Sequence, residues 1–162
     1  MRNGISLIFL DVDGVLNDKD TIAKCGEYRG IDDVKLVLLK EIVDQTKAKI
    51  VLISSWKEQW FTSYKSLQDD LAIYLDQRLS EVGLKISGKV RDEYTSGRGE
   101  AILNYLDVLD KKGIFVSSFA ILDDHVQDYE EKGLLGYLVQ TDFENGGLTP
   151  QLVEKAIQIL RN

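Results

Sequence analysis

Three short apolar runs of the sequence end abruptly in polar side chains that can carry out chemistry. These side chains are Asp11 with Asp13, Ser54 with Ser55, and Asp123 with Asp124. A carboxylate can attack phosphorus and form an acyl-phosphate, and a second carboxylate nearby can move the proton that the reaction requires. The pattern therefore indicates phosphoryl transfer.

Asp11 is the candidate nucleophile. Asp13 lies two residues further on, so in extended backbone it points to the same side and can act as the general acid and base. Gly14 allows a sharp turn beside the phosphate, and Ser54 can donate a hydrogen bond to a phosphoryl oxygen, with Ser55 next to it. We therefore expect the first two runs to supply the nucleophile, the proton carrier and part of the phosphate site.

Phosphoryl transfer also needs a positive charge near the phosphate. Arg98 follows Gly97 at the predicted start of a helix and is our choice for this role. Lys89 and Arg91 are the alternatives. The sequence alone leaves this choice open.

A group of neighbouring carboxylates predicts a metal ion, because like charges raise one another's pKa unless a cation lies between them. Oxygen ligands suit Mg²⁺. Zinc is disfavoured because Cys25 and His125 are the only cysteine and the only histidine. We expect Mg²⁺ as the cofactor, with Cys25 unreactive and His125 in a structural or rim position.

The positions of these residues require a sheet with aligned strand ends. Strands alternate with helices along the chain, which predicts an α/β fold: a three-layer, Rossmann-like sandwich with a mainly parallel central sheet. Ligands bind such sheets outside the carboxyl ends of the strands. The predicted strands cover residues 5–10, 49–53, 119–122 and 135–139, with a short strand or hairpin within 84–91.

The predicted helices fill the intervals between the strands. One is capped by Asp32 and Asp33 and buries Val34, Val37, Leu38 and Ile42, and another covers 57–82 with an apolar stripe from Leu67 to Leu79. Others cover 97–112 and the segment after Thr149 and Pro150, a favourable helix start. Residues 14–31 are predicted to form a loop or flap.

Composition restricts the remaining possibilities. The 162 residues (1–162) fit one domain, and the net charge of -7 disfavours broad nucleic-acid binding while leaving a local basic groove possible. A single cysteine allows no intramolecular disulfide, and no apolar run approaches the roughly 20 residues of a membrane span. We expect a cytoplasmic protein that does not bind membranes.

The motifs resemble those of the haloacid dehalogenase (HAD) superfamily. Residues 10–16 resemble its first motif, Asp-x-Asp-Gly after a strand, and residues 50–54 its second, an apolar strand ending in Ser or Thr. Residues 121–124 with Asp128 resemble its fourth motif, an acidic pair or Asp-x-x-x-Asp. The motifs occur in the family's order across residues 7–128.

The resemblance implies a role for each residue. Asp11 would be the nucleophile and a metal ligand, and Asp13 the acid/base that also binds the metal through its backbone carbonyl. Ser54 would hold the transferring group. Asp124 would bind the metal, with Asp123 or Asp128 assisting. The third motif, a basic residue, is the least defined, and Arg98 is assigned to it ahead of Lys89 and Arg91.

The resemblance also bears on the substrate. The stretch from Thr141 to Thr149 resembles a compact branch of the superfamily, some members of which resemble domains attached to RNA-repair proteins. The intervals 14–49 and 56–97 have no room for a full cap domain. An open site suits a phosphorylated nucleic-acid or protein end, or a small phosphorylated molecule enclosed by a partner.

Several readings compete with these assignments. Asp-x-Asp-Gly could be an ordinary turn, but a calcium loop is rejected because its twelfth position is Ile22. Trp56, Trp60 and Phe61 are more readily core residues than a base-stacking platform, and whether Asn17 and Asp18 line the entrance stays open. The leading function is an Mg²⁺-dependent phosphatase, and the alternative is a phosphoryl or Mg²⁺ sensor with little turnover. A phosphotransferase or dehalogenase ranks lower.

Overall fold

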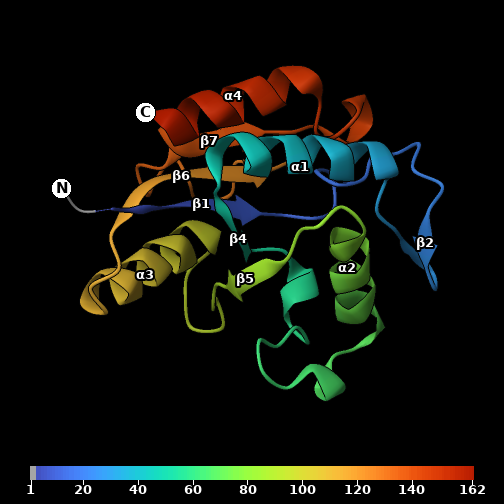
Figure 1. Ribbon diagram of the computed structural model, residues 1–162, viewed down its shortest axis with the longest axis horizontal. Coiled ribbons are helices and arrows are strands. Elements are labelled where there is room, and N and C mark those ends of the chain that lie inside the picture. The colour runs from blue at the N-terminus through green and yellow to red at the C-terminus, as the bar shows by residue number, and fades with distance from the viewer. Residues whose placement is uncertain (1–2) are drawn as a thin grey trace.

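The apolar runs of the sequence form the central sheet of a three-layer α/β sandwich in the computed structural model, which describes residues 3–162 (Figure 1). The five strands are parallel and lie in the order β5-β4-β1-β6-β7. They are β1 (Ile5–Leu10), β4 (Lys49–Leu52), β5 (Ile86–Lys89), β6 (Val116–Asp123) and β7 (Leu138–Gln140). The predicted α/β fold is confirmed.

The central strand β1 is buried on both faces because its side chains enter two different cores. Ile8 and Leu10 belong to the core that also contains side chains of α1 (Asp33–Thr46), α2 (Asp70–Glu81) and α4 (Pro150–Arg161). Leu7 and Phe9 belong to the core covered by α3 (Arg98–Lys111). Figure 1 shows α1 and α4 side by side on one side of the sheet and α3 on the other.

Two helix starts follow the capping residues of the sequence. Asp32 accepts a hydrogen bond from the amide of Val34 at the start of α1. Thr149 caps α4 and Pro150 is its first residue. The apolar face of α1 differs from the prediction, because Val34 and Val37 are exposed and α1 instead buries Leu36, Leu38, Leu39 and Ile42.

The predicted helix over 57–82 is wrong in its first half. Short 3₁₀ turns cover Ser55–Lys57 and Lys65–Leu67, and α2 begins only at Asp70. Asp69 caps α2 by accepting a hydrogen bond from Ala72. Leu67, which was placed on the apolar stripe, is exposed because it precedes the helix.

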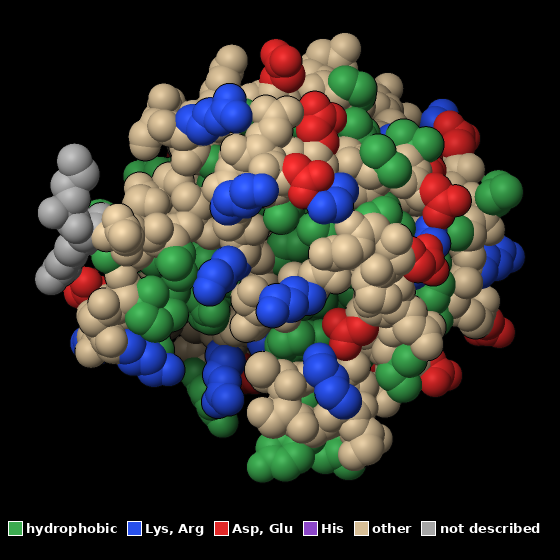
Figure 2. Space-filling view, viewed as in Figure 1, with side chains coloured by type: hydrophobic (Ala, Val, Ile, Leu, Met, Phe, Trp, Pro, Cys, Tyr) green, Lys and Arg blue, Asp and Glu red, His purple; other side chains and the backbone are tan. Residues whose placement is uncertain are grey.

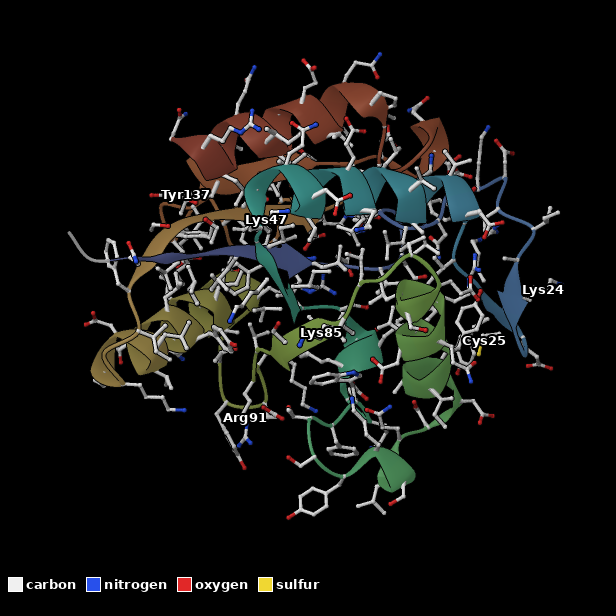
Figure 3. The ribbon with its side chains drawn as sticks, viewed as in Figure 1. Lys24, Cys25, Lys47, Lys85, Arg91 and Tyr137 are labelled. Atoms are coloured by element: carbon white, nitrogen blue, oxygen red, sulfur yellow. The ribbon has the colours of Figure 1, made fainter. Side chains whose placement is uncertain are left out.

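The predicted flap over 14–31 contains a small hairpin. Strands β2 (Lys24–Cys25) and β3 (Tyr28–Arg29) pair antiparallel beside α2, and Figure 3 places Cys25 on this hairpin. Within residues 3–162 the hairpin is the only sheet besides the central one. No helix in the described part of the chain is long and apolar enough to cross a membrane.

Candidate active site

The register of the sheet brings three chemically important strand ends to one level. Leu10 of β1 is paired with Leu52 of β4 on one side and with Leu122 of β6 on the other. The ladder continues for one more step, because the amide of Asp11 donates to Leu122 and that of Ile53 donates to Leu10, both at 2.9 Å. The residues that follow these strands therefore converge on one edge of the sheet.

Three aspartates meet at this edge. Asp11, Asp123 and Asp124 each offer a carboxylate oxygen, and these oxygens lie within 4.8 Å of one another. They come from the ends of β1 and β6, which are paired in the sheet. The cluster is the part of the predicted site that most depends on the strand order.

Asp11 is almost completely buried in this cluster. Its Oδ1 accepts a hydrogen bond from the amide of Val12 at 2.9 Å, and its Oδ2 lies 3.2 Å from a guanidinium nitrogen of Arg98. Burial raises the pKa of Asp11 to about 7, the charges of Asp123 and Asp124 add to the rise, and Arg98 opposes it. The positive charge of Arg98 therefore does not offset the cost of burying the negative charge of Asp11.

Asp123 is fully buried and its hydrogen bonds hold other groups in place. Its Oδ2 accepts hydrogen bonds from Arg98 and from the hydroxyl of Tyr129, both at 2.8 Å, and its Oδ1 accepts one from the amide of His125 at 3.0 Å. Burial, together with the charge of Asp123, raises the pKa of Tyr129, so this hydroxyl remains a donor. Sequence reasoning missed Tyr129.

Asp124 lies against the turn that follows Asp13. A side chain at Gly14 would place its Cβ 2.2 Å from Oδ2 of Asp124, and Gly14 has a φ of 83°, which favours glycine. Burial raises the pKa of Asp124, and Asp123 adds to the rise. His125 is exposed, with Nε2 3.7 Å from Oδ2 of Asp124, so it lies on the rim as the sequence suggested.

Asp13 is exposed at the site, and two side chains hold its carboxylate. The amide nitrogen of Asn17 donates to Oδ1 at 2.9 Å, and the indole nitrogen of Trp56 donates to Oδ2 at 3.1 Å. Trp56 is also buried, so it packs into the core as predicted, but its hydrogen bond to Asp13 was not foreseen. Both oxygens of Asp13 are therefore oriented by donors.

Asn17 stabilises this loop through hydrogen bonds to its backbone. Its side-chain oxygen accepts from the amide of Gly14 at 2.9 Å, and its nitrogen also donates to the carbonyl of Gly30 at 3.0 Å. Asp18 is buried beside Lys35, with 3.6 Å between the charged groups. Both residues fix the loop from within, and neither is exposed at an entrance.

The segment from Thr141 to Leu148 supports the same loop from the other side. Thr141 donates its hydroxyl to the carbonyl of Gly14 at 2.6 Å, and the amide of Leu148 donates to Val15 at 3.0 Å. Gly147 lies so close that a Cβ would be 2.8 Å from the carbonyl of Asn17. These contacts give a physical reason for the residue pattern between Thr141 and Thr149.

Ser54 is buried at the end of β4, and Ser55 beside it is exposed. The hydroxyl oxygen of Ser54 accepts a hydrogen bond from the amide of Trp56 at 3.2 Å. A hydroxyl that accepts one hydrogen bond can still donate its proton. Ser54 can therefore donate to a ligand at this edge.

Among the three candidate basic residues, Arg98 is the one whose side chain reaches the aspartates. Although burial lowers the pKa of Arg98, the charges of Asp11 and Asp123 raise it overall. Lys89 instead donates to the carbonyl of Lys57 at 2.7 Å, and Arg91 is exposed outside the cluster.

Asp128 lies outside the group formed by Asp11, Asp123 and Asp124, and the expectation that Asp123 or Asp128 assists metal binding stays a prediction. Its carboxylate accepts hydrogen bonds from the amides of Gly99 and Glu100, at 2.6 and 3.2 Å. A Cβ at Gly97 or Gly99 would lie within 3.0 Å of this carboxylate. Asp128 thus caps the first turn of α3, which carries Arg98.

The donor set of the cluster fits a hard divalent cation. Three carboxylates face a single guanidinium, and burial, with a further contribution from neighbouring carboxylates, raises the pKa of both Asp11 and Asp124. All candidate ligands are oxygens, as Mg²⁺ prefers. Asp124 has no lysine or arginine partner in residues 3–162, whereas Asp123 is fully engaged in hydrogen bonds.

Comparisons with known proteins agree with this arrangement. The sequence model of a protein family described as "HAD domain in Swiss Army Knife RNA repair proteins" matches residues 7–153. The match spans every strand end described above. No curated protein and no solved structure matched the chain.

Proposed function

The chain belongs to the HAD superfamily, in the family of HAD domains from Swiss Army Knife RNA repair proteins, and we propose that it is an Mg²⁺-dependent phosphatase with Asp11 as its nucleophile. The family suggests phosphohydrolase-type activity. The observation that carries the finer proposal is the meeting of Asp11, Asp124 and Arg98 at one edge of the sheet. We treat residues 1–162 as one catalytic domain.

In the first step, a carboxylate oxygen of Asp11 forms a bond to phosphorus while the bond from phosphorus to the leaving oxygen breaks. Asp13, in its protonated form, gives its proton to that leaving oxygen, so an alcohol departs. The products of this step are an aspartyl-phosphate and the carboxylate form of Asp13.

In the second step, water attacks the phosphorus of the aspartyl-phosphate. The carboxylate of Asp13 takes a proton from this water, and the bond between phosphorus and Asp11 breaks. Phosphate is released, and both aspartates return to their starting states. The hydrogen bonds from Asn17 and Trp56 to Asp13 support this role, because they hold the acid/base in one orientation through both steps.

Arg98 and Ser54 serve the transferring group. Arg98 contacts Asp11 and is anchored by Asp123, so its charge stays beside the nucleophile. Ser54, with Ser55 and the turn at Gly14, would donate hydrogen bonds to phosphoryl oxygens. These fixed donors would stabilise the charge that builds up during transfer.

Mg²⁺ would be held by side-chain oxygens of Asp11 and Asp124 and by the backbone carbonyl of Asp13. When bound, the ion supplies the positive charge that three close carboxylates lack. Asp123 is a weaker candidate ligand, because its two oxygens already accept three hydrogen bonds.

The substrate class follows from the family and the open site. The family description supports a phosphorylated substrate such as an RNA end. Within residues 3–162, the intervals between β1 and β4 and between β4 and β5 hold a small hairpin, short turns and single helices rather than a cap-sized domain, which supports access for the end of a long molecule. We propose phosphomonoesters at RNA ends as the substrates.

Hydrolysis assays test the proposal. We expect release of phosphate from p-nitrophenyl phosphate and from 5′- or 3′-phosphorylated oligoribonucleotides in the presence of Mg²⁺. Asp11→Asn should abolish turnover, whereas Asp20→Asn, the same change at an exposed aspartate outside the cluster, should not. A stable acyl-phosphate without release of phosphate would favour the sensor, and turnover by Asp11→Asn equal to that of the native protein would contradict the mechanism.

A further inference from the structure

A groove of about 400 Å³ lies between the edge strand β5 and helix α3. Its lining residues are Lys89, Arg91, Ala101, Asn104, Tyr105, Val108 and Lys112. Three of them are cationic and none is an aspartate or glutamate, although the whole chain has 27 acidic and 20 basic residues. The groove therefore concentrates positive charge on an acidic protein.

The charges of two groove residues are available to a ligand. Arg91 is exposed, Lys112 is exposed, and within residues 3–162 neither lies within 4.0 Å of a carboxylate oxygen. Lys89 is turned toward the carbonyl of Lys57 and lies over the ring of Phe61. Burial lowers the pKa of Lys89, Lys57 and Arg91 add to this lowering, and Glu93 opposes it.

The surrounding surface continues the positive charge. Figure 2 shows lysine and arginine side chains gathered over β4, β5 and the loop that follows β5. Figure 3 labels Lys47, Lys85 and Arg91 on this same face. Lys47 and Lys85 are exposed and, in the described part of the chain, also form no ion pair.

The groove begins at the catalytic edge of the sheet. Lys89 is paired with Leu52 of β4, and the amide of Val90 donates to Leu52 at 3.1 Å. Val90 is thus level with Ile53 and, one strand further, with Asp11. Strands are spaced about 4.8 Å apart, so the backbone of Val90 lies about 10 Å from that of Asp11, and Arg91 is the next residue.

Gly88 of β5 allows the groove residue Tyr105 to pack against the edge strand. A Cβ there would lie 2.6 Å from the hydroxyl of Tyr105, so glycine lets this ring approach the edge strand. From Ala101 to Lys112 the groove follows α3 for about 17 Å. A stacked strand carries one phosphate per about 3.4 Å, so the groove matches about five nucleotides.

We propose that this groove binds the phosphates of single-stranded RNA whose phosphorylated end lies at Asp11, an inference that takes its substrate class from the proposed function. Arg91 and Lys112 contact phosphates, and Asn104 and the Tyr105 hydroxyl offer additional hydrogen bonds. The position of the groove fits this use, because it begins two strands away from Asp11, about 10 Å from its backbone, and ends at Lys112.

Binding measurements separate this proposal from the catalytic one. Fluorescence anisotropy would follow an eight-nucleotide oligoribonucleotide, with a 5′- or a 3′-phosphate, bound to an Asp11→Asn protein that cannot turn it over. In that background, the double substitution Arg91→Ser with Lys112→Ser should weaken binding about tenfold. It should also make the slope of log K against log[salt] shallower by about 1.4, since each single-strand phosphate contact contributes about 0.7.

The control removes the same charge elsewhere. Lys24→Ser with Lys155→Ser alters two exposed lysines outside the groove and should leave the salt slope within 0.3 of the parent, on the order of half of one contact. A second groove variant, Arg91→Glu, should also weaken RNA binding relative to the Asp11→Asn parent. Thermal unfolding of each variant would show that the fold is retained, since all four positions are exposed.

The outcomes are distinct. Equal losses of RNA affinity in the groove and control variants would contradict RNA binding by the groove. An unchanged salt slope in both groove variants would do the same. The native protein could also bind the oligoribonucleotide through the groove yet release no phosphate from any substrate. That result would support RNA binding by the groove and contradict the proposed phosphatase function. If both hold, the ratio of kcat/KM for the oligoribonucleotide to that for p-nitrophenyl phosphate should fall about tenfold in the groove variants.

Discussion

The indole nitrogen of Trp56 donates a hydrogen bond to Oδ2 of Asp13, joining the turn after β4 to the turn after β1. Asn17 holds the other oxygen of the same carboxylate. The general acid proposed here is thus positioned by two donors, one of which is a core residue.

Trp56→Phe retains an aromatic ring and removes only the N–H donor. We expect kcat/KM for an alkyl phosphate to fall about ten times more than that for p-nitrophenyl phosphate, because nitrophenolate leaves without needing a proton. Steady-state kinetics on the two substrates measures the ratio.

Trp60→Phe is the matched control for this experiment. Trp60 is also buried, and its indole nitrogen donates at 2.9 Å to Asp76, which lies outside the cluster of Asp11, Asp123 and Asp124. Both variants should lose about 1–3 kcal/mol of stability. Only in Trp56→Phe should the fall in kcat/KM depend on the leaving group. The same leaving-group ratio in both variants would show that Trp56 has only a packing role.

The elevated pKa of Asp11 predicts an unusual dependence of stability on pH in metal-free protein. The pKa is about 7 in the folded chain and about 3.9 in the unfolded chain, so between these values the folded state binds more protons. This stabilisation is complete below pH 4 and is lost as the pH rises through 7. In EDTA, we expect about 1.4 kcal/mol less stability at pH 8 than at pH 6, equivalent to about 3–6 °C in Tm.

Asp11→Asn should remove this pH dependence and raise the Tm of metal-free protein at pH 8, since the amide carries no charge to bury. Differential scanning calorimetry at both pH values makes the comparison. An undiminished pH dependence in Asp11→Asn would assign the effect to another group.

Mg²⁺ should stabilise the folded protein. At a concentration 100 times its dissociation constant, a ligand that binds only the folded state adds about 2.7 kcal/mol. We expect a rise in Tm with MgCl₂ that is lost in Asp124→Asn and retained in Asp20→Asn. A full Mg²⁺ response in Asp124→Asn would remove Asp124 from the ligands.

Asp128→Ala separates the two roles that have been considered for Asp128. As a cap of α3, the carboxylate should contribute about 1–2 kcal/mol to stability and help to hold Arg98 in place. The variant should therefore unfold at a lower temperature and have a lower kcat, yet show the full rise in Tm with Mg²⁺. Loss of the Mg²⁺ response would restore the ligand role that the sequence motif implied.

The sequence was sufficient to predict which polar residues lie at the strand ends, because the apolar runs and the residues that follow them are local features. Each apolar run predicts a buried parallel strand, and Asp11, Ser54 and Asp123 follow such runs directly. Their convergence then follows from any order that makes these strands neighbours. Arg98 was also found locally, from its place at a helix start.

The parts that were missed depend on contacts between distant residues. Nothing near Tyr129 indicates that its hydroxyl reaches Asp123, and nothing near Trp56 indicates a bond to Asp13, 43 residues away. Nothing near Asp128 indicates that its carboxylate accepts hydrogen bonds from the amides of Gly99 and Glu100. These bonds form only when β1, β4, β6 and α3 are assembled.

The helix over 57–82 was overextended for a different reason. Helical spacing of apolar residues persists through Leu67, but Gln68 accepts a hydrogen bond from the amide of Phe61, and Asp69 caps the helix that follows. The capping residue was visible in the sequence, as Asp69 before the run that starts at Asp70. Tertiary packing of Trp60, with its bond to Asp76, favours the turns over a longer helix.

The strand order β5-β4-β1-β6-β7 has a consequence for any divided form of this protein. A chain cut in the exposed loop at Tyr94 would leave Asp11, Asp13 and Ser54 on one piece and Arg98, Asp123 and Asp124 on the other. Neither fragment would contain the whole of the proposed active site, and β6 would have to rejoin β1 to complete it. Recovery of phosphatase activity would then measure how far the two fragments had reassembled.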